Sequence, residues 1–149
     1  MKRVLVVAGA LLLSVGAVVA QQDVVKQDQA VMKATGKALG AVLAPMFKGE
    51  KPYDQAAVDE ALKQLDETAK KLPTMFPEGT KGLKAEGDYS AATKIWEDKA
   101  GFAAKISDFA AVVTEAKAKI KDVDSLKAAF PAIGKGCGGC HETFRIKNS

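Results

Sequence analysis

A chain of 149 residues with 48% hydrophobic and 27% charged side chains is long enough for one compact domain and too short for two ordinary ones. The same balance excludes an intrinsically disordered chain. Lys and Arg number 22 against 18 Asp and Glu, a net charge of +4 that would suit nucleic acid or an acidic membrane. Two of these cations, Lys2 and Arg3, belong to a predicted leader, and the other 20 form no basic patch. We therefore expect no nucleic-acid partner.

The first 20 residues have the pattern of a secretory signal. Lys2 and Arg3 precede an uncharged, largely apolar stretch, and the small residues that end at Ala20 predict cleavage there. The alternative is an uncleaved anchor, since the apolar run approaches the roughly 20 residues that span a bilayer. Glycine and serine within the run favour cleavage. We expect a signal peptide at 1–20 and an exported domain at 21–149 that does not stay inserted in the membrane.

Two helices are predicted in the first half of the mature chain. From about residue 22 to 47 apolar residues recur with a helical period, and Met32 and Met46 lie on that apolar face. Gly49 and Pro52 then interrupt the pattern. Asp54 is a plausible N-cap for a second helix, in which apolar residues step by four and three up to residue 72.

Two more helices are predicted in the second half. A connection rich in Pro and Gly spans residues 73–88, and a third helix is expected to open near Ser90. Asp124 is the predicted N-cap of the fourth helix, and Pro131 inside it predicts a bend. The apolar stripe of this helix consists of Leu126, Phe130, Ile133, Cys137, Cys140 and Phe144. No alternating strand pattern or internal repeat is present, so the fold class is all-α, an antiparallel four-helix bundle.

One motif carries chemistry, Cys137-Gly138-Gly139-Cys140-His141, and it uses both cysteines and the only histidine of the chain. C-x-x-C-H is the attachment signature of haem c. Residues three apart share a helix face, so both thiols can bond the two vinyl groups of one porphyrin edge. His141 follows directly and can reach the iron from beneath. We expect Gly138 and Gly139 to leave room for the macrocycle on this face.

Three other interpretations of the motif compete with this one. A disulfide between Cys137 and Cys140 suits an exported protein but leaves His141 unexplained. A thioredoxin-like dithiol stands at the start of a helix after a strand, whereas this pair ends a helix. Zinc needs a fourth ligand that no other Cys or His can provide. Haem c, one group attached through both cysteines, remains the predicted cofactor.

The fourth helix, with its motif near the C-terminus, resembles that of class II cytochrome c, the cytochrome c′ family. Residues 72–80 and 94–96 are similar to the family's inter-helix loop and third-helix opening, and the resemblance covers the mature chain in order. It implies a four-helix bundle that holds one haem c in an exported, usually periplasmic, electron-transfer protein.

The resemblance also implies a second iron ligand. The family's distal residue comes from the first helix, and aligning residues 29–33 with its pattern puts Met32 there, opposite His141. Some five-coordinate members carry a Met at this position and leave it unbound. Residues 49–58 and 119–124 resemble the low-spin, Met-ligated cytochrome c-556 branch, which favours His141 and Met32 as the two metal ligands.

Further cofactor-binding residues follow from the resemblance alone. Gln29 matches a Gln near a haem propionate, whereas Asp28 stands where the family has Arg. A carboxylate would repel a propionate, so we expect Asp28 to turn outward and Lys26 or Lys33 to supply charge. Arg145 matches a basic residue beside the proximal imidazole. It would share a helix face with His141, or it is simply a cation at a helix end.

The function expected from these patterns is transfer of single electrons with redox partner proteins, in the periplasm, and not enzymatic catalysis. The alternative is a five-coordinate haem that binds or buffers nitric oxide. A structural bundle without cofactor would make the clustered Cys and His accidental. Dimerisation through the first two helices, common in the family, is left open by the sequence.

Overall fold

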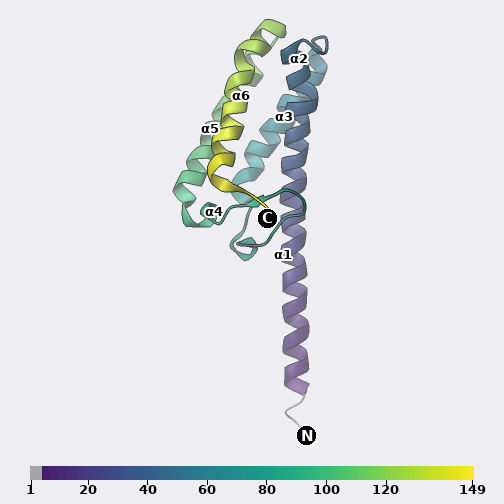
Figure 1. Cartoon of the computed structure of the whole chain (residues 1–149), viewed down its shortest axis with the longest axis vertical. Coiled ribbons are helices and arrows are strands. Elements are labelled where there is room, and N and C mark those ends of the chain that lie inside the picture. Colours follow the sequence, from purple (N-terminus) through teal and green to yellow (C-terminus); the bar gives the residue numbers. More distant parts are fainter. Residues whose placement is uncertain (1–4) are drawn as a thin grey trace.

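The computed structural model describes residues 5–149, with side chains from residue 19 onward. Four long helical segments alternate in direction and form a bundle (Figure 1). They are α1 (Leu5–Lys37) with its continuation, α3 (Gln55–Lys71), α5 (Lys99–Lys119) and α6 (Val123–Phe144). The all-α four-helix bundle predicted from the sequence is confirmed.

The first bundle helix changes its winding near its end. After α1 a π-helical turn spans Ala38–Leu43, and α2 (Ala44–Lys48) completes the helix. Pro45 lacks an N–H and its ring crowds the carbonyl four residues before it, which accounts for the wider hydrogen-bond pattern preceding it. Gly49, at φ 76°, ends the helix in the left-handed region that glycine adopts without strain. The predicted single helix is thus one rod with a local irregularity.

The second helix follows its prediction closely. The Asp54 carboxylate accepts a hydrogen bond from the Ala57 N–H at 3.1 Å and caps α3. The apolar stripe is buried: Val58, Leu62, Leu65, Ala69 and Leu72. Two short 3-10 turns, Leu72–Thr74 and Glu78–Thr80, lie in the connection that follows.

The prediction that the third helix opens near Ser90 was wrong. Ser90 belongs to strand β1 (Tyr89–Ala91), and the helix comes in two pieces, α4 (Lys94–Glu97) and α5. Asp98 separates them because its carboxylate accepts from the Gly101 N–H at 3.0 Å, the geometry of an N-cap. A Cβ at Gly101 would lie 2.5 Å from a carboxylate oxygen of Asp98, so a larger residue there would displace the carboxylate from its capping position.

The fourth helix begins slightly earlier than predicted. Its N-cap is Asp122, whose carboxylate accepts from the Ser125 N–H at 2.8 Å, while the Ser125 hydroxyl accepts from the Asp122 N–H at 3.0 Å. This reciprocal pair is a capping box. Asp124, the predicted cap, lies in the first turn, where the helix dipole favours a carboxylate. The helix passes Pro131 without a break.

The sequence did not predict the two strands. β1 pairs antiparallel with β2 (Arg145–Lys147), with Ser90 opposite Ile146. Each strand has 3 residues, too few for an alternating pattern to be recognised. The pairing ties the C-terminal end of the chain to the loop that precedes α4.

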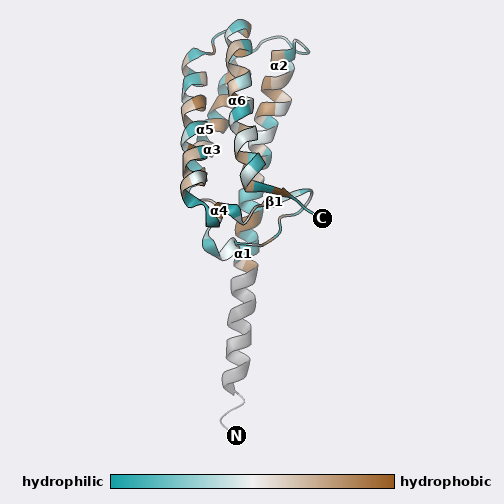
Figure 2. Cartoon of the chain, turned by 60° about the vertical axis from the view of Figure 1, so that its left-hand side comes forward, coloured by the Kyte–Doolittle hydropathy of each residue, from teal (hydrophilic) through white to brown (hydrophobic). Residues whose placement is uncertain are grey.

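Packing between the helices forms the core. α5 packs against α6 and α3, and α3 packs against α1 and the π-helical turn. Figure 2 shows hydrophobic and hydrophilic residues interspersed along the bundle helices. One polar contact crosses the core, a 2.8 Å hydrogen bond between the hydroxyls of Thr35 and Thr68. Among the residues described, none of the helices has the length and apolar character needed to cross a membrane. Most of the predicted leader, residues 1–18, lies outside the residues whose side chains are described, and its cleavage after Ala20 stays a prediction.

Asp66 connects two bundle helices through a pair of lysines, which gives a prediction about pH. Its carboxylate contacts the ammonium groups of Lys70 and Lys117, each at 2.8 Å, and these bonds hold the pKa of Asp66 below its ordinary value. Because the pKa of Asp66 is lower in the folded than in the unfolded protein, its charge stabilises the fold above about pH 4. This stabilisation is lost as the pH falls through the folded-state pKa. We expect Asp66→Asn to lower the unfolding free energy by up to about 1 kcal/mol at neutral pH. At about pH 2, where the carboxylate is protonated, the substitution should have no effect.

Denaturant unfolding at the two pH values measures this difference. Glu60→Gln is the matched control, since Glu60 pairs with Lys63 on an exposed face of the same helix. An equal loss at both pH values would contradict the role assigned to the Asp66 charge.

Candidate functional site

A cavity of about 660 Å³ lies between α1, the 80–91 segment, α5 and α6. Its volume is within the range of about 300–1,000 Å³ usual for cofactor pockets. All the site residues singled out from the sequence line it: Gln29, Met32, Cys137, Cys140, His141 and Arg145. The structure thus brings together residues from the two ends of the domain, while their individual roles stay predictions.

The two cysteines stand one turn apart on α6 and their thiols are not joined to each other. Cys137 packs against the main hydrophobic core, and Cys140 packs against a smaller cluster of Ile95, Trp96 and Phe144. Burial raises the pKa of both thiols, although the nearby ammonium of Lys105 partly opposes this at Cys140. Both sulfur atoms are available to one ligand edge in the cavity.

The chemistry of His141 suits a metal ligand. Burial lowers the pKa of its imidazole, and the positive charge of Arg145 lowers it further. The ring is therefore neutral at physiological pH, which is the form that donates a nitrogen lone pair to a metal.

The sequence predicted that Gly138 and Gly139 leave room for the macrocycle, but a different glycine lines the cavity. Gly136 lines the cavity, whereas Gly138 and Gly139 do not. Residues one and two positions beyond Cys137 are rotated by roughly 100° and 200° around the helix, away from the face that the cysteines share. A Cβ at Gly136 would stand 3.5 Å from the Phe109 ring, so a side chain there would extend into the space beside the cysteines.

Helix α1 supplies the wall that carries Met32. This side chain is half-buried and packs against the main core. Of the other methionines whose side chains are described, Met46 is buried in the core, and Met75 lines a second, smaller cavity. Met32 is therefore the one methionine among residues 19–149 that shares a cavity with His141.

Gln29 has a protein partner in this structure. Its side-chain amide donates to the carbonyl of Glu86, and Gln22, two turns earlier, donates to the carbonyl of Lys84 at 3.0 Å. Lys26 lies 3.7 Å from the Glu86 carboxylate. These contacts hold the loop that forms one wall of the cavity against α1.

Arg145 does not share a helix face with His141, because α6 ends at Phe144 and Arg145 is extended at φ −126° and ψ 141°. Its guanidinium stands 4.2 Å from the centre of the Tyr89 ring, a cation–π contact across the two strands. The prediction of its place on the helix was wrong, although its charge still acts on His141.

Asp28 turns inward, contrary to expectation. Its side chain is 9% exposed, and its carboxylate accepts a hydrogen bond from the Phe76 N–H at 3.0 Å. The facing loop provides a backbone donor, the Phe76 N–H, which outweighs the repulsion by a propionate that would turn Asp28 outward. Burial raises the pKa of Asp28, and the bond from Phe76 opposes the rise. Lys33 lines the same cavity, while Lys26 turns to Glu86.

Sequence reasoning missed two contributors to the site. Asn148 lies just past the last strand and donates to the carbonyls of Ala85, at 3.2 Å, and Gly87, at 2.6 Å, while its own carbonyl accepts from Ser90 at 2.7 Å. Nothing in the pattern near the end of the chain predicts this contact. Phe76 is the other contributor. Its backbone has a φ of 58°, a conformation that a sequence indicates only where it has a glycine or a similar turn residue.

The comparisons agree with this geometry. The family described as cytochrome c′ matches residues 23–145. The chain belongs to the cytochrome c′ family. It is 57% identical to cytochrome c-556 of Rhodopseudomonas palustris over 99% of both chains, and 42% identical to cytochrome c-555 of Bradyrhizobium diazoefficiens over 99% of both.

Solved structures place the fold in the same family. The NMR-validated structural model of oxidised R. palustris cytochrome c556 is 56% identical, with a TM-score of 0.75 over 86% of this chain and 99% of that one. Cytochrome c′ from R. palustris is 40% identical, with a TM-score of 0.76 over 85% of this chain and 98% of that one.

Family membership identifies the cofactor as covalently bound haem c, and the similarity to cytochromes c-556 and c-555 fits a monohaem electron carrier. The residues present fit this group. Two unpaired thiols share a helix face, a neutral imidazole follows them, and the cavity that they line is large and mostly apolar. Cys137 and Cys140 would hold the porphyrin edge, and His141 would bind the iron.

Removing the thiols gives a direct test of covalent attachment. We expect Cys137→Ala and Cys140→Ala each to retain haem through one thioether, and the double variant to release all of its haem into acidified organic solvent. Extraction of colour, together with the mass of the intact chain, measures this. Extractable pigment in the wild-type protein would contradict covalent attachment.

Proposed function

We propose that this cytochrome carries single electrons through a low-spin, six-coordinate haem whose iron ligands are His141 and Met32, and that it is a carrier and not an enzyme. Bound haem supplies an iron that alternates between the ferric and ferrous states. The observation that supports the proposal is the position of Met32 in the cavity that also contains His141.

The helical scaffold favours ligands that stay in place. Met32 lies on α1, which packs against α3, and His141 lies on α6, which packs against α5. Two ligands on separate, well-packed helices move little when the charge of the iron changes, because their backbones are fixed by the core. Little movement means a small reorganisation cost, which suits a protein that only accepts and passes on an electron.

The cavity lining favours the ferrous state. Aromatic and aliphatic side chains surround the space between the two proposed ligands, among them Phe102, Ile106 and Phe109. An apolar environment disfavours the additional positive charge of ferric iron, and a thioether ligand acts in the same direction. Met32 and the lining together support a raised reduction potential.

The second candidate function is nitric oxide binding at a five-coordinate haem. One solved structure with 31% identity is a nitric oxide complex of a point mutant of cytochrome c′ from Alcaligenes xylosoxidans, with a TM-score of 0.73 over 85% of this chain and 97% of that one. That ligand belongs to that protein. In this chain a methionine lines the cavity at the proposed distal position, which favours an iron without a free site.

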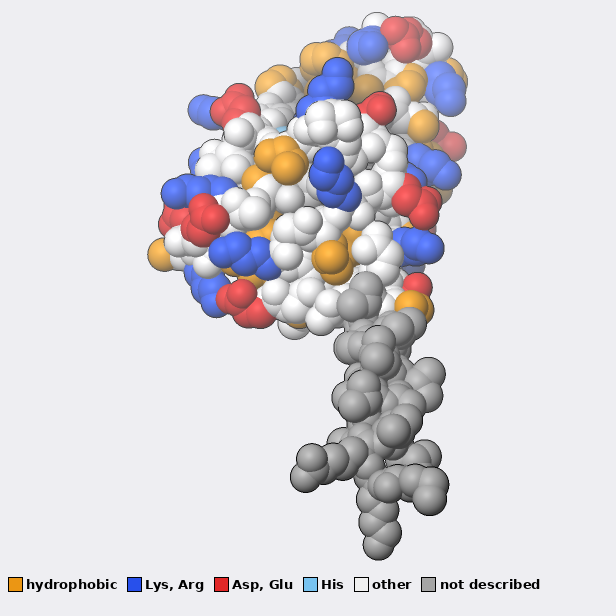
Figure 3. All heavy atoms as spheres, turned by 60° about the horizontal axis from the view of Figure 1, so that its bottom comes forward, with side chains coloured by type: hydrophobic (Ala, Val, Ile, Leu, Met, Phe, Trp, Pro, Cys, Tyr) orange, Lys and Arg blue, Asp and Glu red, His pale blue; other side chains and the backbone are white. Residues whose placement is uncertain are grey.

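We place the mature protein in the periplasm, with redox proteins as partners, on the basis of the predicted leader at residues 1–20. Lys and Arg are interspersed with Asp and Glu on the face shown in Figure 3. A mixed surface of this kind suits brief encounters steered by local charges more than tight binding to one polyanion.

Replacing Met32 tests the ligand assignment. We expect Met32→Ala to convert the haem to a high-spin form, to lower its reduction potential, and to let it bind carbon monoxide readily. Visible spectra of the oxidised and reduced protein, with and without carbon monoxide, measure these changes. Met75→Ala is the matched control, because Met75 lines the smaller cavity, and its spectrum should match the wild type. A low-spin Met32→Ala protein would refute the assignment.

Export gives a separate prediction. Expressed with its full leader in a host that matures cytochromes c, the protein should be found in the periplasmic fraction with an intact mass of residues 21–149 plus one haem. Replacing Ala20 with a bulky residue should block processing, because signal peptidase requires small residues at the site. A protein that retains residues 1–20 in the wild type would contradict cleavage.

A further inference from the structure

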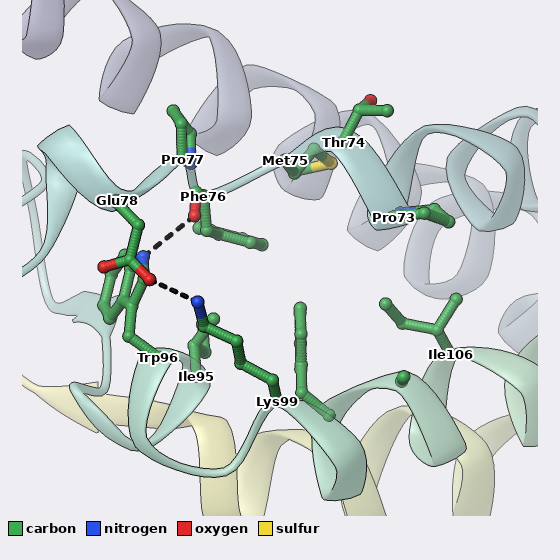
Figure 4. A pocket seen from close by; sticks show the side chains of 12 residues that line it. Pro73, Thr74, Met75, Phe76, Pro77, Glu78, Ile95, Trp96, Lys99 and Ile106 are labelled. Carbon is green, nitrogen blue, oxygen red and sulfur yellow. Dashed lines mark hydrogen bonds and ion pairs between the residues drawn. The ribbon is translucent and has the colours of Figure 1, made fainter.

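A second cavity, of about 420 Å³, adjoins the haem cavity (Figure 4). It lies between the 73–78 segment and the first turns of α5. Its rim is exposed and includes the ion pair between Glu78 and Lys99, at 2.5 Å. The residues that line both cavities are Phe76, Ile95, Trp96, Phe102 and Ile106. These shared residues separate the haem cavity from a space that opens at the protein surface.

Phe76 is the member of this partition that comes from a loop. Its ring packs against both hydrophobic clusters and meets the Phe102 ring edge-on, with 5.9 Å between ring centres. Figure 4 shows the ring extending into the space between the 73–78 segment and α5. The other members are fixed on helices, so the partition depends on how the loop holds Phe76.

The backbone of Phe76 is in a conformation that it does not prefer. Its φ of 58° lies in the left-handed region, where a bulky residue is strained. Two side chains hold it there from opposite sides of its backbone. The Asp28 carboxylate accepts from the Phe76 N–H at 3.0 Å, and the Trp96 indole N–H donates to the Phe76 carbonyl at 2.9 Å.

We propose that Asp28 is a positioning residue which, together with Trp96, holds the Phe76 ring as the partition that closes the haem cavity toward the second cavity. Loss of either hydrogen bond lets the strained backbone relax and the ring move, and the two cavities then join. A path from solvent to the haem opens. The inference rests on the proposed function only in taking haem as the occupant of the larger cavity.

The test uses the haem-loaded protein and two variants of Asp28. Asp28→Leu removes the acceptor, whereas Asp28→Asn removes the charge and keeps a carbonyl oxygen that can accept from the Phe76 N–H. Two quantities are measured. One is the rate of imidazole binding to ferric haem, for which every protein compared also carries Met32→Ala so that the iron has a free site. The other is the hydrogen exchange rate of the Phe76 amide. Asp23→Leu is the matched control, since Asp23 is an exposed carboxylate on the same helix.

We expect Asp28→Leu to raise both rates at least about tenfold, because a hydrogen bond to a charged acceptor is lost. Asp28→Asn should restore both to within about threefold of the wild type, since a neutral acceptor keeps part of that bond, and Asp23→Leu should change neither. Trp96→Phe removes the bond to the Phe76 carbonyl and also part of a ring that lines both cavities. It should raise both rates, and the exchange rate of the Phe76 amide, which this substitution does not touch directly, decides the question if Asp28→Leu does not fold.

Two results would overturn the proposal. Wild-type rates in both Asp28→Leu and Trp96→Phe would show that the hydrogen bonds do not control the partition. Equal acceleration in Asp28→Leu and Asp28→Asn would show that Asp28 acts through its charge and not by positioning Phe76. If the wild-type protein contained no haem, the proposed function would be refuted instead. A colourless preparation would distinguish that result from the two results that refute the role of Asp28.

Discussion

The cavity exists because the first and last bundle helices meet at one end of the molecule only. At that end α2 packs against α6, and the rings of Phe47 and Phe130 stack with 4.4 Å between their centres. Towards the other end α1 stays with α3 while α6 stays with α5, and the space between the two pairs becomes the cavity. The helix contacts that build the core thus leave one gap, and the residues of the haem-attachment motif line it.

Irregular chain closes this gap, and polar contacts hold the irregular chain. The 80–91 segment receives hydrogen bonds from α1 through Gln22 and Gln29, and from the C-terminal end through Asn148. The same segment pairs with β2, which directly follows the helix that carries His141. The wall of the cavity is therefore tied to both helices that bear the proposed iron ligands. Each of these bonds joins residues far apart in the sequence, so the wall forms only when the bundle is complete.

The sequence predicted what depends on local pattern. The Asp54 cap, the apolar stripes of the helices, and the convergence of Met32 with the cysteines and His141 in one cavity follow from spacing and from family resemblance. Contacts between segments far apart in the chain were not predicted. Whether Asp98 caps a new helix turn, and whether Asp28 turns toward solvent or toward the Phe76 N–H, depends on which backbone groups the distant chain brings near. A single buried carboxylate finds its donor 48 residues away, and no period in the sequence encodes such a distance.

Helices α6 and α1, on the two sides of the haem cavity, differ in how tightly each must hold the haem. On α6 the thioether links and the imidazole come from one short run of consecutive residues, so a rigid stretch of helix defines how haem is held, and the motif can be recognised without any structure. On α1 nothing is covalent. There a side chain can bind the iron, stand near it or leave room for a ligand without loosening the cofactor, because retention is already guaranteed by the opposite helix. One fold can therefore support both an electron carrier and a gas binder. In the function proposed here, the choice between them depends on whether Met32 binds the iron. Met32 lies on an apolar helix stripe, and its place in the cavity with His141 distinguishes it from a methionine that only fills the core.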